Sequence, residues 1–555
     1  MIAFIGAGLL LLSWLQPNHY LPWVSWHSEG LAFVSVLFVA VWGAVRAATQ
    51  PNFGKVAIPY AVAPLLAVAL LAWIQVAIGR LSFSGDALIY SFYVALSMAC
   101  LCMGFADAKR KEHLTLLAAT LTVGSLLSFI LLAAQALDLY EDTIWINRML
   151  QYRRPGGNLG QPNQLATLLL MGIASVVYLV ESKKLGKLCA ALLSVILILG
   201  LAATESRTGA VSMSALVICW FAWRQRLASS LSKPVVVIFV SAYLAALWSW
   251  PVALNEYHIN AGATPTIDVS AGTRWLVWPQ LIDAVLMRPW CGWGLGQVSS
   301  ALNAVAHSYD MGESFTFAHN LLLDIALGVG IPLTILIVVM ALIWTWRRIK
   351  SINDFSSWYC LVVIVPVAVH SMLEFPFAYS YFLAPVMYAL GALDGHFSKG
   401  KAVNIDARAV LAAVSASGFL MAWSAFEYLN IEEDFRIVRF EALRLGKTPV
   451  AYERPKVALL SQLDALLIGG RVVPSPGMTV DQIELSRKVA LRFPWPATQN
   501  RYALSLALNG QEVEAVRQLK VMRTLHGEKS YAQIKLYWVN LAEERHPQLQ
   551  AFSLP

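Results

Sequence analysis

Charged residues are scarce in this chain of 555 residues. Only 13% of the residues are Asp, Glu, Lys or Arg, whereas 58% are hydrophobic, and the mean hydropathy is +0.60. A chain this apolar cannot bury its hydrophobic surface in a single soluble core, which excludes an ordinary soluble globular protein. The composition therefore predicts an integral membrane protein.

Cysteine is also rare, and the common catalytic and cofactor motifs are missing. The six cysteines fall mostly inside apolar runs, so no disulfide framework and no paired CxxC metal site is available. The sequence has no HExxH, no GxSxG and no dinucleotide fingerprint, and the pairs His27 with Glu29 and His370 with Glu374 lack further nearby ligands. We expect no metal and no cofactor. The net charge of +8 is scattered in groups of two or three, which argues against nucleic acid as a partner.

Long apolar runs are what the chain has in abundance. About thirteen of them predict a polytopic transmembrane helical bundle over residues 1–428, although several are shorter than the roughly 20 residues that a spanning helix needs, and one short run could be re-entrant. The first run lacks a basic flank and an A-x-A site, which favours a retained span. The runs lie near residues 2–15, 30–45, 57–78, 87–106, 114–136, 165–180, 188–203, 209–223, 234–250, 320–346, 357–370, 377–393 and 407–427.

The loops between the runs differ in their content of Lys and Arg. One alternating set carries 17 of these residues and the other carries 7. Because cytoplasmic loops are enriched in Lys and Arg, this bias places the N-terminus in the cytoplasm of a bacterium. An odd number of spans then places the large loop 251–318 and the C-terminus in the periplasm.

The composition changes after the last apolar run. Residues 429–555 have ordinary charge density and amphipathic helical periodicity, as in YALSLALNGQEVEAVRQLKVMRTLHG. This stretch resembles one tetratricopeptide unit, but no repeat has a fixed period. We expect a soluble, periplasmic, α-helical domain that chooses an acceptor and does no chemistry.

One histidine lies where a polar loop meets an apolar run. The stretch Ser314 to Gly330, SFTFAHNLLLDIALGVG, places His319 and Asn320 at this join. Imidazole has an unperturbed pKa near neutrality, so a histidine held there could take a proton from a hydroxyl nucleophile. The alternative is an amphipathic side chain that anchors a helix end among the lipid headgroups.

Four arginines lie in loops on the side of the membrane where basic residues are disfavoured. Guanidinium presents a planar pair of donors that suits phosphate and stays charged at any relevant pH. We therefore predict a diphosphate-binding site formed by Arg207, Arg274, Arg153 and Arg154. The alternative for each of them is snorkelling to the headgroups.

Two further segments of the chain carry polar residues that are candidates for the same site. The Gly-rich GGNLGQPNQ contains Gln161 and Asn163 and offers backbone N–H donors before a helix, which suits an anion but is also typical of a turn and cap. His370 and Glu374 break the next apolar pattern, in HSMLEFPF. They are either part of the site or buried polar partners near a helix end.

Five segments together resemble a known family. They are PNHYLPWVSWHSE, GNLGQPNQLAT, ESRTG, AHNLLLDIALGVGIP and HSMLEFPFAYSYFLAPV, within residues 1 to about 450. They look like the bacterial O-linked, pilin-glycosylating oligosaccharyltransferases of the PglL type, which are related to the O-antigen ligases (WaaL) and the O-antigen polymerases. The resemblance implies an all-α, GT-C-like membrane fold. It also implies that His319 is the essential histidine and that Arg207 and Arg274 contact the diphosphate.

The resemblance implies transfer of a whole glycan from undecaprenyl diphosphate to a Ser or Thr hydroxyl of a periplasmic protein such as pilin. The diphosphate is already a good leaving group, so its developing charge needs Arg207 and Arg274, while the hydroxyl needs His319 as base. No nucleotide or metal is then required. Three rivals remain: an O-antigen ligase that uses a lipid A core sugar as acceptor, an O-antigen polymerase, and a polytopic transporter.

Overall fold

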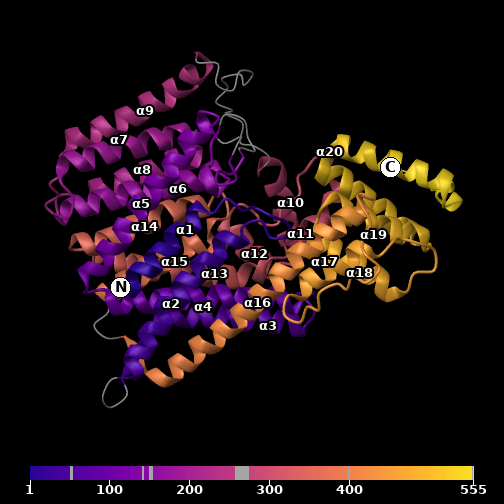
Figure 1. The fold of residues 1–555 in the computed structure, drawn as a ribbon, viewed down its shortest axis with the longest axis horizontal. Helices are drawn as coiled ribbons and strands as arrows, with labels where there is room; N and C mark the ends of the chain where they lie inside the picture. The colour runs from indigo at the N-terminus through magenta and orange to yellow at the C-terminus, as the bar shows by residue number, and fades with distance from the viewer. Residues whose placement is uncertain are drawn as a thin grey trace. The chain divides into compact units, whose positions relative to one another are not determined.

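The described part of the chain is mostly helical. The computed structural model describes residues 1–49, 54–139, 143–148, 154–256, 274–397, 401–552 and 554, and within them it contains twenty α-helices and one pair of strands (Figure 1). They divide into two compact units. Unit 1 is formed by Met1–Ala67, Phe92–Val269 and Leu342–Met421, and unit 2 by Val68–Ser91, Ser270–Ala341 and Ala422–Pro555.

Unit 1 is a bundle of apolar helices. Its α-helices are α1 (Ile2–Leu15), α2 (Trp26–Ala48), α5 (Lys111–Ala136), α6 (Pro162–Glu181), α7 (Lys187–Ala203), α8 (Arg207–Trp223), α9 (Lys233–Glu256), α14 (Phe355–Ser371) and α15 (Ser380–Phe397). Short 3-10 turns occur at η1 (Tyr60–Val62), η2 (Gly157–Leu159) and η4 (Pro376–Ala378).

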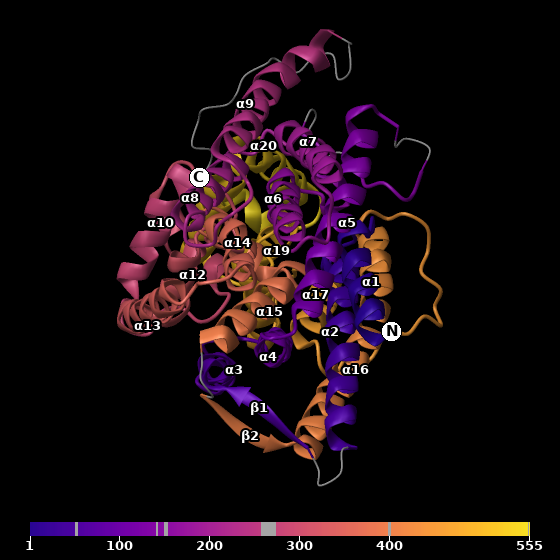
Figure 2. The same cartoon turned by 90° about the vertical axis from the view of Figure 1, so that its left-hand side faces the viewer.

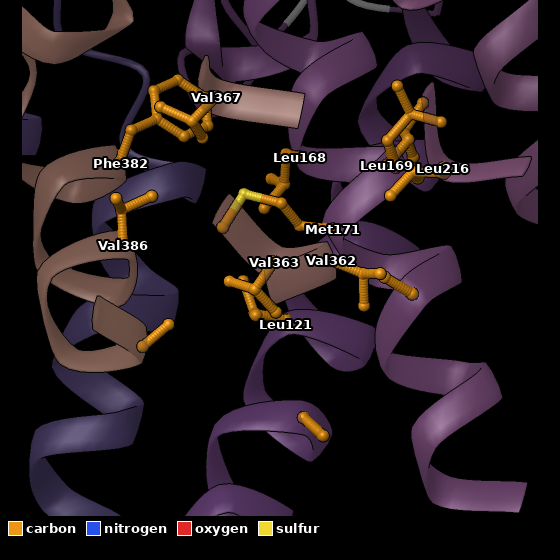
Figure 3. Close-up of a cluster of buried hydrophobic side chains, with 14 of the residues drawn as sticks. Leu121, Leu168, Leu169, Met171, Leu216, Val362, Val363, Val367, Phe382 and Val386 are labelled. Atoms are coloured by element: carbon orange, nitrogen blue, oxygen red, sulfur yellow. The ribbon is translucent and has the colours of Figure 1, made fainter. Parts of the chain in front are cut away.

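The helices of unit 1 pack around α6 and α14. Close to this centre, Leu168 and Met171 of α6 lie beside Val363 of α14 and Leu121 of α5, and all four side chains are buried (Figure 3). Most of α6 is enclosed by its neighbours, whereas α9 exposes most of its surface. α6 is therefore the central helix of the bundle.

Unit 2 joins three separate parts of the chain. It holds α10 (Arg274–Met287), α11 (Val298–Val305), α12 (Leu321–Val329), α17 (Ser461–Arg471), α18 (Val480–Arg492), α19 (Pro496–Leu508) and α20 (Glu512–Glu544), with the turns η3 (Ala306–Ser308) and η5 (Pro547–Ala551). Four further helices contribute residues to both units: α3 (Ala63–Ala77), α4 (Ser84–Asp107), α13 (Ile331–Lys350) and α16 (Ala407–Ala442).

The prediction of an all-α polytopic membrane protein is confirmed. Each of the thirteen apolar runs contains a helix, and eight helices among the described residues are long and apolar enough to cross a membrane. Shorter apolar helices occupy the runs at Ile2–Leu15, Lys187–Ala203 and Phe355–Ser371.

The run predicted near 320–346 is two helices instead of one. α12 ends at Gly330, whose φ of +82° lies in the left-handed region, and α13 starts at the next residue. A Cβ at Gly330 would lie 2.5 Å from the backbone carbonyl group of Trp290, so this close approach requires glycine. The helix that follows His319 is therefore short.

The last apolar run continues further than predicted. α16 runs for 36 residues to Ala442, past the expected end at residue 427, because no Gly or Pro follows Gly418 in this helix. The predicted boundary between residues 428 and 429 thus falls inside a continuous helix. The division into a membrane domain and a soluble domain stays a prediction.

The strand pair was not predicted from the sequence. β1 (Lys55–Pro59) pairs antiparallel with β2 (Ala402–Asp406), with Lys55 opposite Asp406 (Figure 2). β1 overlaps the start of the run near 57–78. Its partner lies more than 340 residues away in the chain, so local periodicity could not reveal the pairing.

Candidate functional site

His319 lies directly before α12, as predicted. Asn320 caps this helix, because its side-chain oxygen accepts hydrogen bonds from the backbone N–H groups of Leu322 and Leu323, each at 3.1 Å. The side chain of His319 is partly buried and stacks on Phe315 with ring centroids 4.3 Å apart. The φ of His319 is +53°, which lies in the left-handed region that non-glycine residues adopt infrequently.

The residue before His319 is held by both of its backbone polar groups. The N–H of Ala318 donates to both carboxylate oxygens of Asp324, at 3.1 Å each, and its carbonyl accepts from the indole N–H of Trp278 at 2.9 Å. Asp324 is part of α12 and Trp278 is part of α10, so two helices fix the backbone from which the imidazole projects. Burial raises the pKa of Asp324 to about 7, and the hydrogen bond from Ala318 opposes this shift.

α12 is in turn anchored by a buried amide. Gln75 is 4% exposed, donates to the carbonyl of Gly328 at 3.0 Å and accepts from the N–H of Leu295 at 2.8 Å. Trp293 adds a backbone hydrogen bond to Leu327 at 2.6 Å. All of these residues belong to unit 2. The helix that follows His319 is thus held at its C-terminal end by Gln75 and Trp293.

The segment that leads to His319 also contacts the C-terminal tail. Thr524 donates to the carbonyl of Tyr309 at 2.6 Å, and Ser314 donates to the carbonyl of Pro494 at 3.1 Å. The approach to the histidine is therefore packed against α20 and the loop after α18.

A second polar network lies in unit 1, around the buried carboxylate of Glu374. This carboxylate accepts from Gln161 at 3.5 Å and from Asn163 at 3.3 Å. The amide oxygen of Asn163 accepts from Ser206 at 2.7 Å. Ser206 caps α8 by accepting from the N–H of Gly209, so the network reaches the residue directly before Arg207.

Two of the predicted arginines lie at this corner. Arg207 is the first residue of α8 and is exposed, while Arg154 donates to the carbonyl of Thr204 at 3.2 Å. Burial lowers the pKa of Arg154 from its usual value, Glu205 and Glu374 oppose this shift, and the charge of Arg207 adds to it. Arg154 and Arg207 therefore lie within electrostatic range of each other.

His370 joins the network one helical turn before Glu374. It is fully buried, and its Nδ1 lies 2.8 Å from the hydroxyl of Thr167. The same hydroxyl donates to the backbone carbonyl of Asn163 at 3.0 Å. His370 and Glu374 thus connect the end of α14 to the first turns of α6.

Of the remaining two predicted arginines, the structure describes only one. Arg274 is the first residue of α10 and is partly exposed. Arg153 lies outside the described residues. The structure thus gathers Arg154, Gln161, Asn163, Arg207, His370 and Glu374 in unit 1, and His319, Asn320 and Arg274 in unit 2.

Several polar residues of the two networks were not predicted from the sequence. Asp324 could have been found, because it is the single charged residue of α12, five positions after the histidine. Gln164 links Gln161 to Tyr381 through hydrogen bonds of 2.9 and 2.8 Å, and no sequence pattern indicated this pair. Within the described part of the chain, no three His, Cys, Asp or Glu side chains gather as a metal site would require.

Comparison with known proteins matches three family models to successive parts of the chain. The model for "Protein glycosylation ligase" matches residues 155–180, that for "O-Antigen ligase" matches 192–338, and that for "Virulence factor membrane-bound polymerase, C-terminal" matches 358–539. Gln161 and Asn163 fall in the first match, and His319 falls in the second.

Two curated proteins of Acinetobacter baylyi are similar to the chain. One, named general O-oligosaccharyltransferase, is 25% identical over 542 residues, which cover 95% of this chain and 92% of that protein. The other, named ComP-specific O-oligosaccharyltransferase, is 28% identical over 364 residues, or 64% of this chain and 66% of that protein. These matches confirm the resemblance drawn from the motifs. The chain is thus similar in sequence to the O-antigen ligases and to the protein O-oligosaccharyltransferases.

Proposed function

We propose that this protein transfers a preassembled oligosaccharide en bloc from undecaprenyl diphosphate to Ser or Thr hydroxyl groups of periplasmic proteins, with a pilin-like protein as one acceptor. The observation that carries the proposal is the similarity over 95% of the chain to a general O-oligosaccharyltransferase. The bond that breaks joins the sugar to the diphosphate, and the bond that forms joins the same sugar carbon to the acceptor oxygen.

His319 is the general base in this proposal. A hydroxyl is a poor nucleophile at neutral pH, and an imidazole removes its proton as the new bond forms. Three features of the structure support the assignment: the left-handed backbone of His319, its stacking on Phe315, and the two hydrogen-bonded groups of Ala318. Strain and bracing of this kind are expected where the direction of a side chain matters.

The arginines are assigned to the diphosphate. Arg207, Arg274, Arg153 and Arg154 carry the charge that a departing diphosphate requires, and the planar guanidinium suits its oxygens. Support comes from Arg154 and Arg207, which lie close together at a corner held by Asn163 and Ser206. In this assignment Gln161, Asn163, His370 and Glu374 position the corner.

The reaction as proposed needs no metal, because the diphosphate is already a good leaving group. Transfer by the purified protein should persist in excess chelator. Loss of transfer on chelation, restored by a divalent cation, would contradict this part of the proposal.

The orientation follows from the loop charges. The N-terminus lies in the cytoplasm of a bacterial inner membrane, and the His319 loop and the tail lie in the periplasm. Single cysteines introduced at Tyr20 and at Met311, which are both exposed, in a Cys-free background should react with an impermeant maleimide in intact spheroplasts. A cysteine at Ser351 should react only after lysis.

A second candidate function is favoured by one observation. Residues 192–338 match the O-antigen ligase model. If this protein were such a ligase, its acceptor would be a sugar hydroxyl of a lipid A core. Both functions predict loss of transfer in His319→Ala, so the acceptor must be identified directly.

Mass spectrometry of periplasmic proteins tests the proposed function. Cells that make a lipid-linked glycan should show a glycan mass on Ser or Thr peptides when they express this chain. Cells that express His319→Ala should not. A glycan found on lipid A core and on no protein would establish the ligase function instead.

A further inference from the structure

The loop between Arg154 and Gln161 is buried, although connecting loops normally run over the surface of a protein. We call residues 155–160 the Gly-rich loop, and its residues up to Leu159 are enclosed. A Cβ at Gly156 would lie 2.6 Å from the backbone nitrogen of Gln161, so the chain folds back closely on itself and requires glycine here. The loop is thus built like part of a core.

The side chain of Asn158 holds this loop against two other segments. Its Nδ2 donates to the backbone carbonyls of Leu15 at 2.6 Å and Trp145 at 2.8 Å, and its Oδ1 accepts from the backbone N–H of Asn147 at 2.9 Å. Asn158 is 2% exposed, so these partners replace water. Two donors and one acceptor on one short side chain are what an asparagine amide supplies. One buried amide therefore joins the end of α1 and the segment 143–148 to the Gly-rich loop.

The backbone of Asn158 is joined to the N-terminal segment by a histidine. Nε2 of His19 lies 2.7 Å from the carbonyl oxygen of Asn158, and because a carbonyl only accepts, this nitrogen donates. The segment is fixed at its other end, where the buried carboxylate of Glu29 accepts from the indole N–H of Trp23 at 3.1 Å and from the backbone N–H of Ser380 at 3.4 Å. The stretch from His19 to Glu29 thus connects the Gly-rich loop with the start of α15.

A second buried amide secures the residue before Asn158. Gln135 is 1% exposed, donates to the carbonyl of Gly157 at 3.1 Å and accepts from the N–H of Gly157 at 2.8 Å. It also donates to the carbonyl of Asn147 at 2.7 Å. A buried polar network in which every group is paired rigidifies the segment that it holds. Two adjacent residues of the Gly-rich loop are therefore fixed in place.

The course of this loop matters because both of its ends reach the corner before α8. Arg154 donates to the carbonyl of Thr204 at 3.2 Å, and Gln161 donates to Glu374 at 3.5 Å. A binding side chain keeps its geometry only when the backbone that carries it is held in advance. The hydrogen bonds of the loop consequently decide where the guanidinium of Arg154 lies.

We propose that Asn158 is a positioning residue for the donor diphosphate. It fixes the Gly-rich loop, and with it Arg154, and it couples the loop to the N-terminal segment through His19. This inference rests on the proposed function, in which Arg154 contacts the diphosphate. Asn158 acts through Arg154 and does not itself touch the donor.

Kinetics of the full-length protein in detergent test this role. Asn158→Asp keeps an acceptor for the N–H of Asn147 but places an oxygen against the carbonyls of Leu15 and Trp145, so the loop should loosen. The KM for the lipid-linked donor should rise about tenfold, while the KM for an acceptor peptide stays at the wild-type value. Binding of undecaprenyl diphosphate, which carries no glycan, should weaken by the same factor.

Two variants of His19 separate its hydrogen bond from the bulk of its ring. His19→Gln places an amide N–H close to the position of Nε2 and should keep the wild-type KM for the donor. His19→Met has a similar length but no donor, so its KM for the lipid-linked donor should rise several-fold. His19 is only partly buried, so this pair decides the matter even if Asn158→Asp does not fold.

Tyr359→Phe is the matched control for lost stability. Tyr359 is fully buried in unit 1, and its hydroxyl lies 2.8 Å from that of Ser175. Ser175 lies in the second half of α6, about 20 Å from the first residue of this helix and so away from the Gly-rich loop. Loss of this hydrogen bond lowers the folded fraction and hence the apparent kcat, but both KM values should stay at the wild-type level.

Three outcomes would overturn the inference. They are a wild-type KM for the donor in folded Asn158→Asp, a rise of the same size in Tyr359→Phe, and equal KM values in His19→Gln and His19→Met. Wild-type protein that binds no undecaprenyl diphosphate would instead overturn the proposed function, and the inference with it. The wild-type control therefore distinguishes the two failures.

Discussion

At the scale of single residues, the geometry around His319 gives the most direct test of the chemistry. His319→Ala should remain in the membrane and lose transfer by on the order of 10²-fold or more, because general-base action is removed. Transfer of a fluorescent lipid-linked glycan to an acceptor peptide measures the loss. His307→Ala serves as control, because His307 is exposed and lies in the same segment. Activity of His319→Ala equal to that of the control would reject the assignment.

Arg207 and Arg274 should be sensitive to the shape of the cation as well as to its charge. Lysine keeps the charge but loses the two-pronged donor set. The Lys variants should therefore lose transfer partly, the Ala variants almost wholly, and donor binding should weaken in the same order. Binding of the lipid-linked donor to the purified protein is the measurement. Wild-type donor affinity in all four variants would exclude contact with the diphosphate.

Asp324 should make stability depend on pH. Its pKa is raised to about 7 in the folded protein from an ordinary value near 4, so folding takes up a proton between these values. Stability should consequently fall as the pH rises from about 4 to about 7 and then level off. Asp324→Asn keeps an acceptor for Ala318 but does not titrate, so this contribution should vanish. Thermal unfolding in detergent across this range, with wild type as reference, decides the matter, and identical pH dependences would contradict it.

At the scale of elements, the corner before α8 depends on one hydroxyl. Ser206 both caps α8 and donates to Asn163, so Ser206→Ala should destabilise the protein by about 1 kcal/mol and loosen the helix start that carries Arg207. We expect a raised KM for the lipid-linked donor. Ser214→Ala, which removes an exposed hydroxyl from the same helix, is the control. Equal KM values in the two variants would show that the corner does not position the arginine.

Elements formed by interactions between near neighbours in the chain could be predicted from the sequence, whereas elements formed by distant residues could not. Helices follow from local apolar runs, and the helix start after His319 follows from its Asn320 cap. The break at Gly330 depends on the approach of Trp290, forty residues earlier in the chain, and was missed. The strand pair, of which Lys55 is part, was missed for the same reason.

The same limit applies to the candidate site, because only some of its residues could be predicted from the sequence. Residues that stand out chemically in apolar surroundings, such as His319, Arg207 and Glu374, were identified from the sequence. Neutral partners such as Ser206 and Thr167 were not, because a hydroxyl on a helix is unremarkable until its acceptor is known. Arg153 was predicted but lies outside the described residues, so its place in the site stays a prediction.

At the scale of the whole molecule, the tail has contacts that its expected role does not explain. The sequence suggests that residues 429–555 choose the acceptor. Within unit 2, however, Asn303 and Gln518 exchange hydrogen bonds of 3.0 and 3.2 Å, and Ser299 donates to the carbonyl of Leu491 at 2.6 Å. With the contacts at Tyr309 and Ser314, they place tail residues along the segment that leads to His319. We infer that the tail also positions this segment.

Point variants in the full chain test that inference better than a truncation, because α16 continues unbroken into the tail. Asn303 and Gln518 are 3% and 1% exposed, so replacing one amide by Leu leaves the other without its buried partner, at a cost of about 1–3 kcal/mol. Asn303→Leu and Gln518→Leu should each lower transfer to a short peptide as well as to the intact acceptor protein. Because the double variant removes both polar groups, it should lose less stability than the sum of the two single losses. A role limited to acceptor choice predicts the opposite pattern, in which transfer to the short peptide stays at the wild-type rate in both single variants while transfer to the protein falls.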